Sequence, residues 1–161
     1  MGGYILKINI VCVGNIKEKF YSSACSEYVK RLSKYHTVEI VEVEEEKLPK
    51  NYSEADIAKV RVKESLRIEK HCKGYIVVLD VFGKELTSEQ LATKLKTIAS
   101  ESFTVTFVIG GSYGLSDLMK QKANLLLSFS RFTFPHQLMR VIFLEQLYRA
   151  LSIINNMKYH K

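Results

Sequence analysis

Three short segments of the sequence carry the glycine, hydroxyl and carboxylate groups that could bind a ligand. Residues 79–84 (Leu-Asp-Val-Phe-Gly-Lys) and 108–114 (Val-Ile-Gly-Gly-Ser-Tyr-Gly) each run from an apolar stretch into glycine. Residues 127–134 (Leu-Ser-Phe-Ser-Arg-Phe-Thr-Phe) are apolar with interspersed hydroxyls and lead into Pro135, one of two prolines. Because glycine has no Cβ atom, it lets backbone approach a ligand closely. These segments are the first candidates for a binding site.

Each segment also has an ordinary structural explanation, and the residues alone leave both open. Two glycines after a strand more often form a tight turn than a ligand loop. Asp80 can shape its own turn as readily as it can accept a hydrogen bond from a ligand hydroxyl or amine. Pro135 suits the first turn of a helix, and Thr133 could cap that turn. The dinucleotide fingerprint and the phosphate loop are both absent, which counts against an oxidoreductase or kinase that binds a nucleotide.

These segments fall within a repeating order of apolar strands and amphipathic helices. Apolar and β-branched runs predict strands at 6–13, 37–43, 74–79, 103–109 and 125–129. Helical spacing and capping signatures predict helices at 18–35, 53–72, 87–99, 116–122 and 136–154. This order is typical of a single-domain α/β fold, with a mostly parallel sheet and helices on both faces. Ligands of such sheets usually lie beyond the carboxyl ends of the strands, so we expect a site at the loops 80–83, 110–114 and 130–134.

The bulk composition limits the class of partner and the compartment. A length of 161 residues suits one domain, and a net charge of +7 favours a polyanionic partner. Charge alone does not separate RNA, DNA, an acidic lipid surface and plain solubility. Cys12, Cys25 and Cys72 lack the spacing of a metal or redox site, so we expect a reduced, cytoplasmic protein without a metal. Since no run of about 18 apolar residues exists, we expect no membrane span.

The last predicted helix, 136–154, is apolar almost all round. Its few polar side chains include Arg140, Glu145, Gln146 and Arg149. A helix of this kind must be covered on more than one side. In a chain this short, we expect one cover to be the sheet and the other to be a second copy of the protein, in a homodimer around a twofold axis.

Taken in their order along the chain, several segments of the sequence resemble the SPOUT-class methyltransferases of the RlmH type, which modify a pseudouridine in bacterial 23S rRNA. The likeness covers residues 6–161. The matching stretches are 27–31, 79–84 with 88–89, 107–115, 127–140, 145–150 and 159–161. The Gly-Gly loop, the Pro-His-Gln helix start and the Tyr-His-basic end are together specific to this family.

The resemblance implies a fold, a cofactor and an oligomeric state. The fold is the SPOUT α/β knot, with a deep trefoil knot near the carboxyl terminus that general topology rules predict against. The oligomer is a homodimer, and the cofactor is S-adenosylmethionine. By position in the family pattern, the cofactor contacts Leu79, Gly110, Phe129, Ser130, Arg131, Phe132, Thr133 and Phe134.

The resemblance also implies a reaction, the methylation of N3 of a pseudouridine in 23S rRNA of the large subunit, within the whole ribosome. Because the N3–H must be lost, a general base or a stabilising cation is expected. We expect His160 to be the base, Tyr159 to stack on or orient the uracil ring, and Arg140 or Arg149 to pair with phosphate or imide oxygens. Glu145 lies four residues before Arg149 and could pair with it instead. The alternatives are a SPOUT enzyme acting on tRNA and a non-catalytic ribosome-binding protein.

The chain departs from the family pattern in three places. Residues 1–5 form a short leader, which we expect to be frayed, before the single domain begins. Arg131-Phe132 stands where lysine and methionine are common, which keeps the charge of the loop. Asn156 replaces a usual glycine in front of the active-site tail, residues 158–161. Since asparagine tolerates positive φ, we expect the turn to be kept.

Overall fold

Five parallel strands form the central sheet of the computed structural model, which describes residues 5–161. The strands are β1 (Lys7–Val13), β2 (Thr37–Val43), β3 (Tyr75–Glu85), β4 (Thr104–Ile109) and β5 (Leu125–Ser128). Their order across the sheet is β2-β1-β4-β3-β5, and every neighbouring pair is parallel. The predicted parallel α/β sheet is therefore confirmed. The frayed leader was predicted for residues 1–5, of which 1–4 lie outside the described residues.

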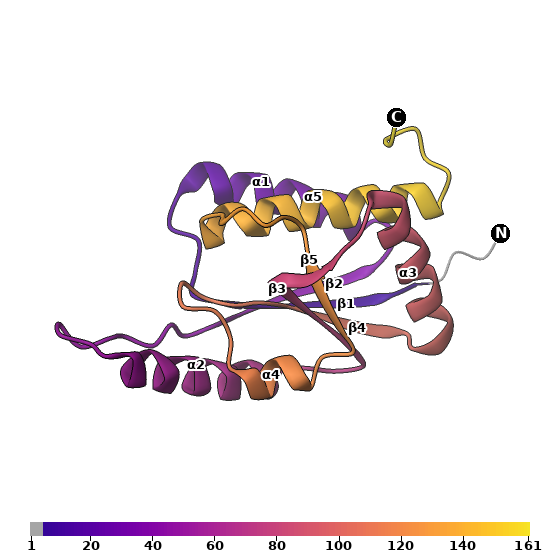
Figure 1. Cartoon of the computed structure of the whole chain (residues 1–161). Helices are drawn as coiled ribbons and strands as arrows, with labels where there is room; N and C mark the ends of the chain where they lie inside the picture. Colours follow the sequence, from indigo (N-terminus) through magenta and orange to yellow (C-terminus); the bar gives the residue numbers. More distant parts are fainter. Residues whose placement is uncertain (1–4) are drawn as a thin grey trace.

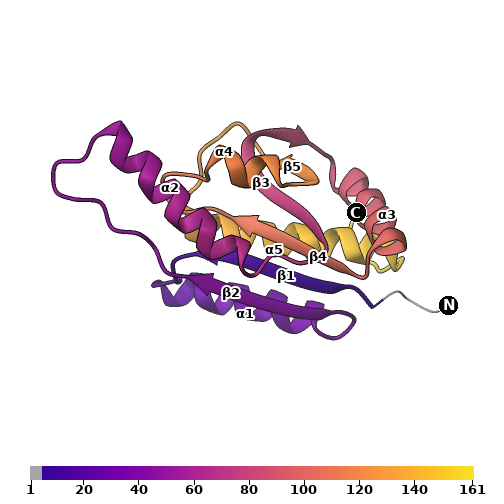
Figure 2. The same ribbon diagram turned by 90° about the horizontal axis from the view of Figure 1, so that it is seen from below.

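Helices cover both faces of this sheet, as predicted (Figure 1). They are α1 (Lys19–Leu32), α2 (Glu54–Glu69), α3 (Ser88–Glu101), α4 (Asp117–Gln121) and α5 (His136–Ile154). On one face, α5 lies against both α1 and α3. Seen from below, α2 and α4 lie in front of the opposite face (Figure 2). The trefoil knot stays a prediction.

The central strands bury side chains on both of their faces, as parallel strands usually do. In β1, Ile8, Ile10 and Cys12 pack toward α1, α3 and α5, whereas Val11 and Val13 pack toward α2 and α4. The period of two along the strand thus divides the apolar residues between two cores that share one sheet.

The third strand is longer than its predicted span, 74–79, and bulges at the segment singled out above. Leu127 of β5 is paired with both Leu79 and Lys84, so the four residues between these two are extra in β3. A Cβ atom on Gly83 would lie 2.7 Å from the Leu126 carbonyl carbon, which explains why glycine occupies this close approach. Residues 80–83 therefore form a bulge within β3, beside β5, and not a loop after the strand.

The predicted helix starts at Ser53 and Thr87 are confirmed, since both residues form capping boxes. The prediction that Thr133 caps the last helix is wrong. Pro135 occupies the N-cap position of α5, which has no side-chain capping bond, and its carbonyl accepts the Met139 N–H at 2.9 Å. At the other end, Asn156 has a φ of 52°, so asparagine keeps the turn as expected.

Candidate functional site

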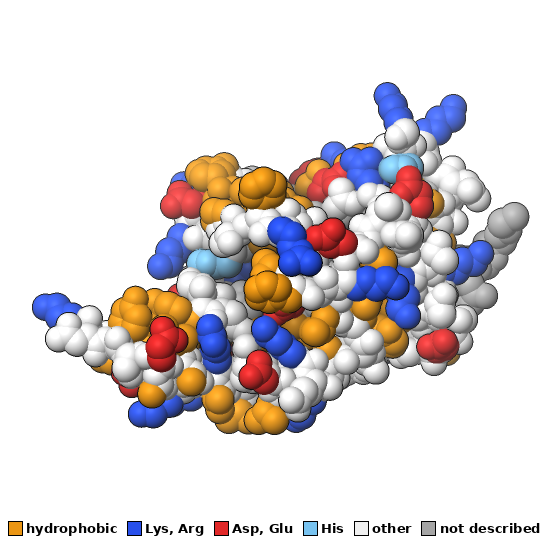
Figure 3. All heavy atoms as spheres, viewed as in Figure 1, with side chains coloured by type: hydrophobic (Ala, Val, Ile, Leu, Met, Phe, Trp, Pro, Cys, Tyr) orange, Lys and Arg blue, Asp and Glu red, His pale blue; other side chains and the backbone are white. Residues whose placement is uncertain are grey.

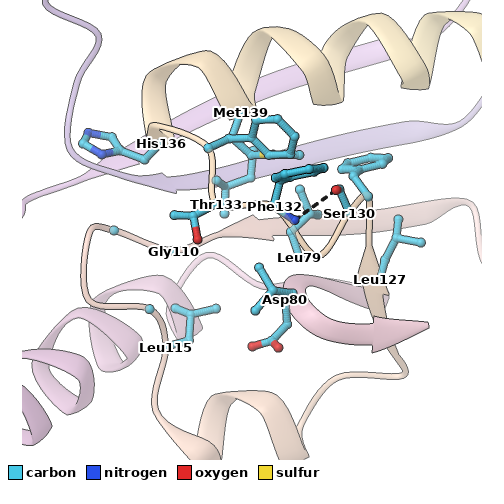
Figure 4. A pocket seen from close by; sticks show the side chains of 16 residues that line it. Leu79, Asp80, Gly110, Leu115, Leu127, Ser130, Phe132, Thr133, His136 and Met139 are labelled. Carbon is cyan, nitrogen blue, oxygen red and sulfur yellow. Dashed lines mark hydrogen bonds between the residues drawn. The ribbon is translucent and has the colours of Figure 1, made fainter. Parts of the chain in front are cut away.

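A cavity of about 210 Å³ lies where β3, β4 and β5 end and α5 begins (Figure 4). All three loops predicted from the sequence contribute to its wall. Of the proposed cofactor-binding residues, those that line it are Leu79, Gly110, Phe129, Ser130, Phe132, Thr133 and Phe134. Arg131 does not line it, because its exposed side chain points to Glu85, with Nε 3.5 Å from the carboxylate. Whether these residues bind a cofactor stays a prediction.

Nine other lining residues were not among the proposed cofactor contacts. They are Asp80, Val81, Ile109, Gly111, Gly114, Leu115, Leu127, His136 and Met139. His136 and Met139 lie in the first turn of the helix that begins after Pro135. Their position at the start of a helix, beside a candidate ligand loop, is the signal in the sequence from which they could have been predicted.

The glycine loop is both a tight turn and part of the cavity wall. The Gly114 N–H donates to the Gly111 carbonyl at 3.1 Å, and Gly114 has a φ of 78°, which favours glycine. A Cβ atom on Gly110 would lie 2.9 Å from Cγ of the buried Leu115. The tight turn is therefore confirmed, and binding of a ligand by this loop stays a prediction.

Hydroxyl groups shape the loop before α5. The Phe132 N–H donates to Ser130 Oγ at 3.0 Å (Figure 4), and Ser128 Oγ donates to the Val81 carbonyl at 3.2 Å. The second bond joins this loop to the bulge of β3. The Phe132 ring remains 77% exposed at the cavity. The loop is thus ordered by its own polar groups and leaves its aromatic rings available for contact.

Asp80 mainly shapes its own turn. Its carboxylate points toward α4, away from Phe132 and Met139 (Figure 4), and accepts the Phe82 N–H at 2.9 Å. Lys120 Nζ lies 2.7 Å from the same group. Burial alone would raise the pKa of Asp80, but the Lys120 ammonium and the Phe82 N–H outweigh it and lower the pKa. Asp80 is therefore a paired carboxylate at the edge of the cavity.

The carboxyl-terminal histidine is held by an acidic partner. His160 Nε2 lies 2.8 Å from Glu89 Oε1. Hydrogen bonds from the Glu89 N–H, from Thr87 and from His160 lower the pKa of Glu89 to about 2. Because an ionised carboxylate can only accept, Nε2 must carry the proton, and Nδ1 is the basic nitrogen of the neutral ring. Nδ1 is buried without a hydrogen-bond partner among the described residues.

Tyr159 lies in an aromatic and charged setting. Its hydroxyl donates to Glu145 at 3.1 Å, its ring meets Tyr148 edge-on at 4.8 Å, and the Arg149 guanidinium lies 4.8 Å from its centroid. Burial, followed by the hydrogen bonds to Tyr28 and Glu145, raises the pKa of Tyr159. Its phenol therefore stays protonated at neutral pH.

Within one chain, the tail packs against the middle of α5, whereas the cavity lies at the start of this helix. The Tyr159 hydroxyl donates to Glu145 and His160 is held by Glu89 of α3, while His136 and Met139 in the first turn of α5 line the cavity. Six residues of helix, about 9 Å at roughly 1.5 Å per residue, separate Met139 from Glu145. None of residues 158–161 lines the cavity, so the structure does not bring the proposed base into the proposed cofactor site of the same chain.

The two arginines of α5 are engaged in bonds within the chain. Arg140 is 4% exposed, pairs with Glu42 at 2.7 Å and donates to the Val13 carbonyl at 2.9 Å. It borders a separate cavity of about 500 Å³ between α1, β2 and α5, away from the glycine loop. Arg149 pairs with Glu145, which is the alternative that the spacing suggested. A contact from Arg140 to a substrate would require its present bonds to break.

The outer surface carries charges of both signs. Basic side chains are spread over the face in Figure 3, from the region of α4 to the carboxyl terminus, with acidic side chains between them. Apolar side chains gather over the start of α1 and the start of α5. Among residues 5–161, no three His, Cys, Asp or Glu side chains are placed to hold a metal ion. None of the described helices combines the length and the apolar character that a membrane span requires.

Comparisons with known proteins agree on one family. The family model described as "Predicted SPOUT methyltransferase" matches residues 6–160. Proteins named "Ribosomal RNA large subunit methyltransferase H" are similar, with 47% identity in Natranaerobius thermophilus (96% of this chain, 99% of the relative) and 45% in Halothermothrix orenii (97% and 100%). A solved structure of a probable methylase family protein from Haemophilus influenzae matches with a TM-score of 0.51 at 10% identity, covering 96% of this chain and 69% of that one. This last likeness concerns the fold alone.

Proposed function

The chain belongs to the SPOUT methyltransferase family, and from that premise we propose that it methylates N3 of a pseudouridine in 23S rRNA, using S-adenosylmethionine. The names of its relatives, which refer to RNA of the large ribosomal subunit, support this class of substrate. The net charge of +7 suits a polyanionic partner. We place the reaction on the assembled large subunit or the whole ribosome, and so in the cytoplasm.

The observation that carries this proposal is the convergence of the three loops in one cavity. Glycine at position 110 lets the backbone pass close to Leu115, which also lines the cavity, and Leu79, Leu127 and Phe129 provide apolar walls. Ligand sites usually measure about 300–1,000 Å³, so a cavity of about 210 Å³ would enclose a nucleoside and leave the rest of the cofactor outside. The residues therefore fit the adenosine part of S-adenosylmethionine.

When bound, S-adenosylmethionine supplies an activated methyl group on a sulfonium. The chain has to exclude water, align the base and remove its N3 proton. His160 Nδ1 is the proton acceptor in this proposal, because Glu89 holds the ring by Nε2, and the tail has to shift to expose this buried nitrogen to the substrate. Tyr159, which stays protonated, orients the uracil ring.

We further propose that the tail of one copy completes the cavity of a second copy in a homodimer. Within one chain the tail is bonded to Glu145 and Glu89 and none of its residues lines the cavity, so a single chain cannot unite the two regions without moving the tail. In the described chain, α1 and α3 already flank α5. The apolar side chains over the starts of α1 and α5 (Figure 3) provide the surface for the second copy.

The test of the reaction is to incubate the protein with tritiated S-adenosylmethionine and ribosomes that lack the modification. We expect label at N3 of one pseudouridine in the large-subunit rRNA. Label in tRNA alone would overturn the assignment of the substrate, and no transfer to any RNA would favour a non-catalytic ribosome-binding protein.

A further inference from the structure

A buried carboxyl group lies behind the glycine loop. Glu64 of α2 is 2% exposed. Its Oε1 accepts the Glu46 N–H at 2.9 Å, whereas Oε2 is buried and has no hydrogen-bond partner among the described residues. Because buried polar atoms are nearly always satisfied, an open carboxylate oxygen requires an explanation.

The open oxygen faces Gly111, which lines the cavity. A Cβ atom on Gly111 would lie 3.2 Å from Glu64 Oε2 and 3.0 Å from Val13 Cγ1. The carboxyl group of Glu64 therefore lies behind Gly111, which forms part of the cavity wall.

Other residues of α2 already hold the glycine loop in place. Arg61 Nε donates to the Tyr113 carbonyl at 2.6 Å, and the Ser116 N–H donates to Ser65 Oγ at 3.1 Å. Glu64 lies between these two contacts along the helix, but its Oε2 adds no bond to the loop. Anchoring of the loop therefore does not account for a carboxylate at this position.

The charged groups around Glu64 leave its open oxygen without a cation. On its own helix, Lys63 and Arg67 both pair with Glu46. The segment before the helix adds only the negative charges of Glu45 and Glu46. The glycine loop contributes Gly111, which has no side chain, and β1 contributes the apolar Val13. Burial raises the pKa of Glu64, with the Glu46 N–H and Arg67 acting against it.

We propose that Glu64 is a positioning residue whose carboxylate makes the cavity favour the sulfonium cation of S-adenosylmethionine over the uncharged thioether of the product, S-adenosylhomocysteine. This inference rests on the proposed function. A fixed, unpaired charge in a dry interior acts over several ångströms, so a carboxylate behind Gly111 stabilises a positive ligand. Once the methyl group has been transferred, the sulfur loses its charge and this attraction disappears, which helps the product to leave.

The test compares the affinities of the two ligands by calorimetry, in wild type and in Glu64→Gln. Glutamine keeps the size of the side chain and an acceptor for the Glu46 N–H, but removes the charge. We expect the preference for S-adenosylmethionine over S-adenosylhomocysteine to fall about tenfold, with the affinity for the product unchanged. Glu69→Gln is the matched control, because it removes an exposed carboxylate from the same helix. It should leave the preference unchanged.

A second measurement needs only the wild-type protein. The carboxylate is present above the pKa of Glu64 and is protonated as the pH falls through it, so binding of the cation releases a proton. Between about pH 7.5 and about pH 5, we expect the affinity for S-adenosylmethionine to fall relative to that for S-adenosylhomocysteine.

The outcomes separate this inference from the proposed function. If wild type binds both ligands, but their relative affinity is the same at every pH and in Glu64→Gln, Glu64 has only a structural role and the inference is wrong. If Glu64→Gln lowers the affinity for both ligands equally, the conclusion is the same. If wild type binds neither ligand, the proposed cofactor is wrong and this inference falls with it.

Discussion

His160 is the clearest case of a side chain whose role depends on one partner. A histidine one residue from a chain end is ordinarily free to rotate. Here the ionised Glu89 fixes the proton on Nε2 and leaves Nδ1 as the basic nitrogen of the neutral ring. A carboxylate and an imidazole 71 positions apart in the chain thus define one proton-accepting atom.

His160→Ala should lower the rate of rRNA methylation by about 100- to 10,000-fold, which is the usual contribution of a general base. The affinity for S-adenosylmethionine should not change, because the proposed cofactor contacts come from the three loops and not from the tail. Methylation rates and calorimetry together check this. His71→Ala, which removes an exposed histidine outside the tail, is the control. A rate in His160→Ala equal to that of wild type would remove His160 as the base.

Gly110→Val should raise the Kd for S-adenosylmethionine about 100-fold or more while the protein stays folded. The physical reason is that any Cβ at this position lies 2.9 Å from Cγ of the buried Leu115 and would displace the cavity wall. Calorimetry measures the affinity, and circular dichroism checks the fold. Ser112→Val, at an exposed position of the same loop, should bind normally. Normal binding by Gly110→Val would refute this location of the cofactor.

At the scale of elements, α5 is positioned by contacts at several points along its length. Arg140 ties its first half to the ends of β1 and β2, and Phe143 packs on Phe107 of β4 at 4.8 Å between ring centroids. Gln146 reaches Ser88 at the start of α3, with 2.7 Å between their side-chain oxygens. The helix that begins at the cavity and leads to the tail is therefore held firmly against the sheet.

Arg140→Ala should reduce the free energy of unfolding by about 3 kcal/mol, because it leaves buried carbonyl groups without their donor. Urea unfolding measures the change. Arg31→Ala removes an exposed pair with Glu27 and should change the free energy of unfolding far less. Equal effects of the two substitutions would show that Arg140 does not anchor α5.

For the whole molecule, the separation of tail and cavity is the main constraint on function. Both regions have a role in the proposed reaction, yet within one chain the tail is bonded to Glu145 and Glu89 and contributes no residue to the cavity wall. A twofold dimer resolves this, because a copy turned around can present its tail to the cavity of its neighbour. A sedimentation experiment that finds only an 18.5 kDa species at micromolar concentration would exclude this arrangement.

Complementation between two inactive variants tests the shared site directly. A chain truncated after Lys158 should bind S-adenosylmethionine without methylating rRNA, and Gly110→Val should do neither. When equal amounts are mixed and allowed to exchange subunits, half of the dimers are mixed and each holds one complete site. About a quarter of the wild-type activity should therefore return. If mixed dimers form but stay inactive, the tail acts on its own chain.

The sequence by itself determined the elements and the edge of the sheet at which the cavity lies. Period-two and helical spacing are local properties, so the β2 span, the α5 span and the capping boxes at Ser53 and Thr87 could be predicted closely. Parallel strands bring their carboxyl ends to one edge, which is why the three candidate loops could be predicted to mark the site.

Only the tertiary structure decided which side chains meet. The bulge in β3 depends on pairing with β5, Arg140 is bound to Glu42 across 98 positions, and Glu64 faces Gly111 from a different element. The distance between tail and cavity likewise depends on how α5 lies along the sheet. Such contacts join residues that are remote in the chain, so local spacing carries no signal for them.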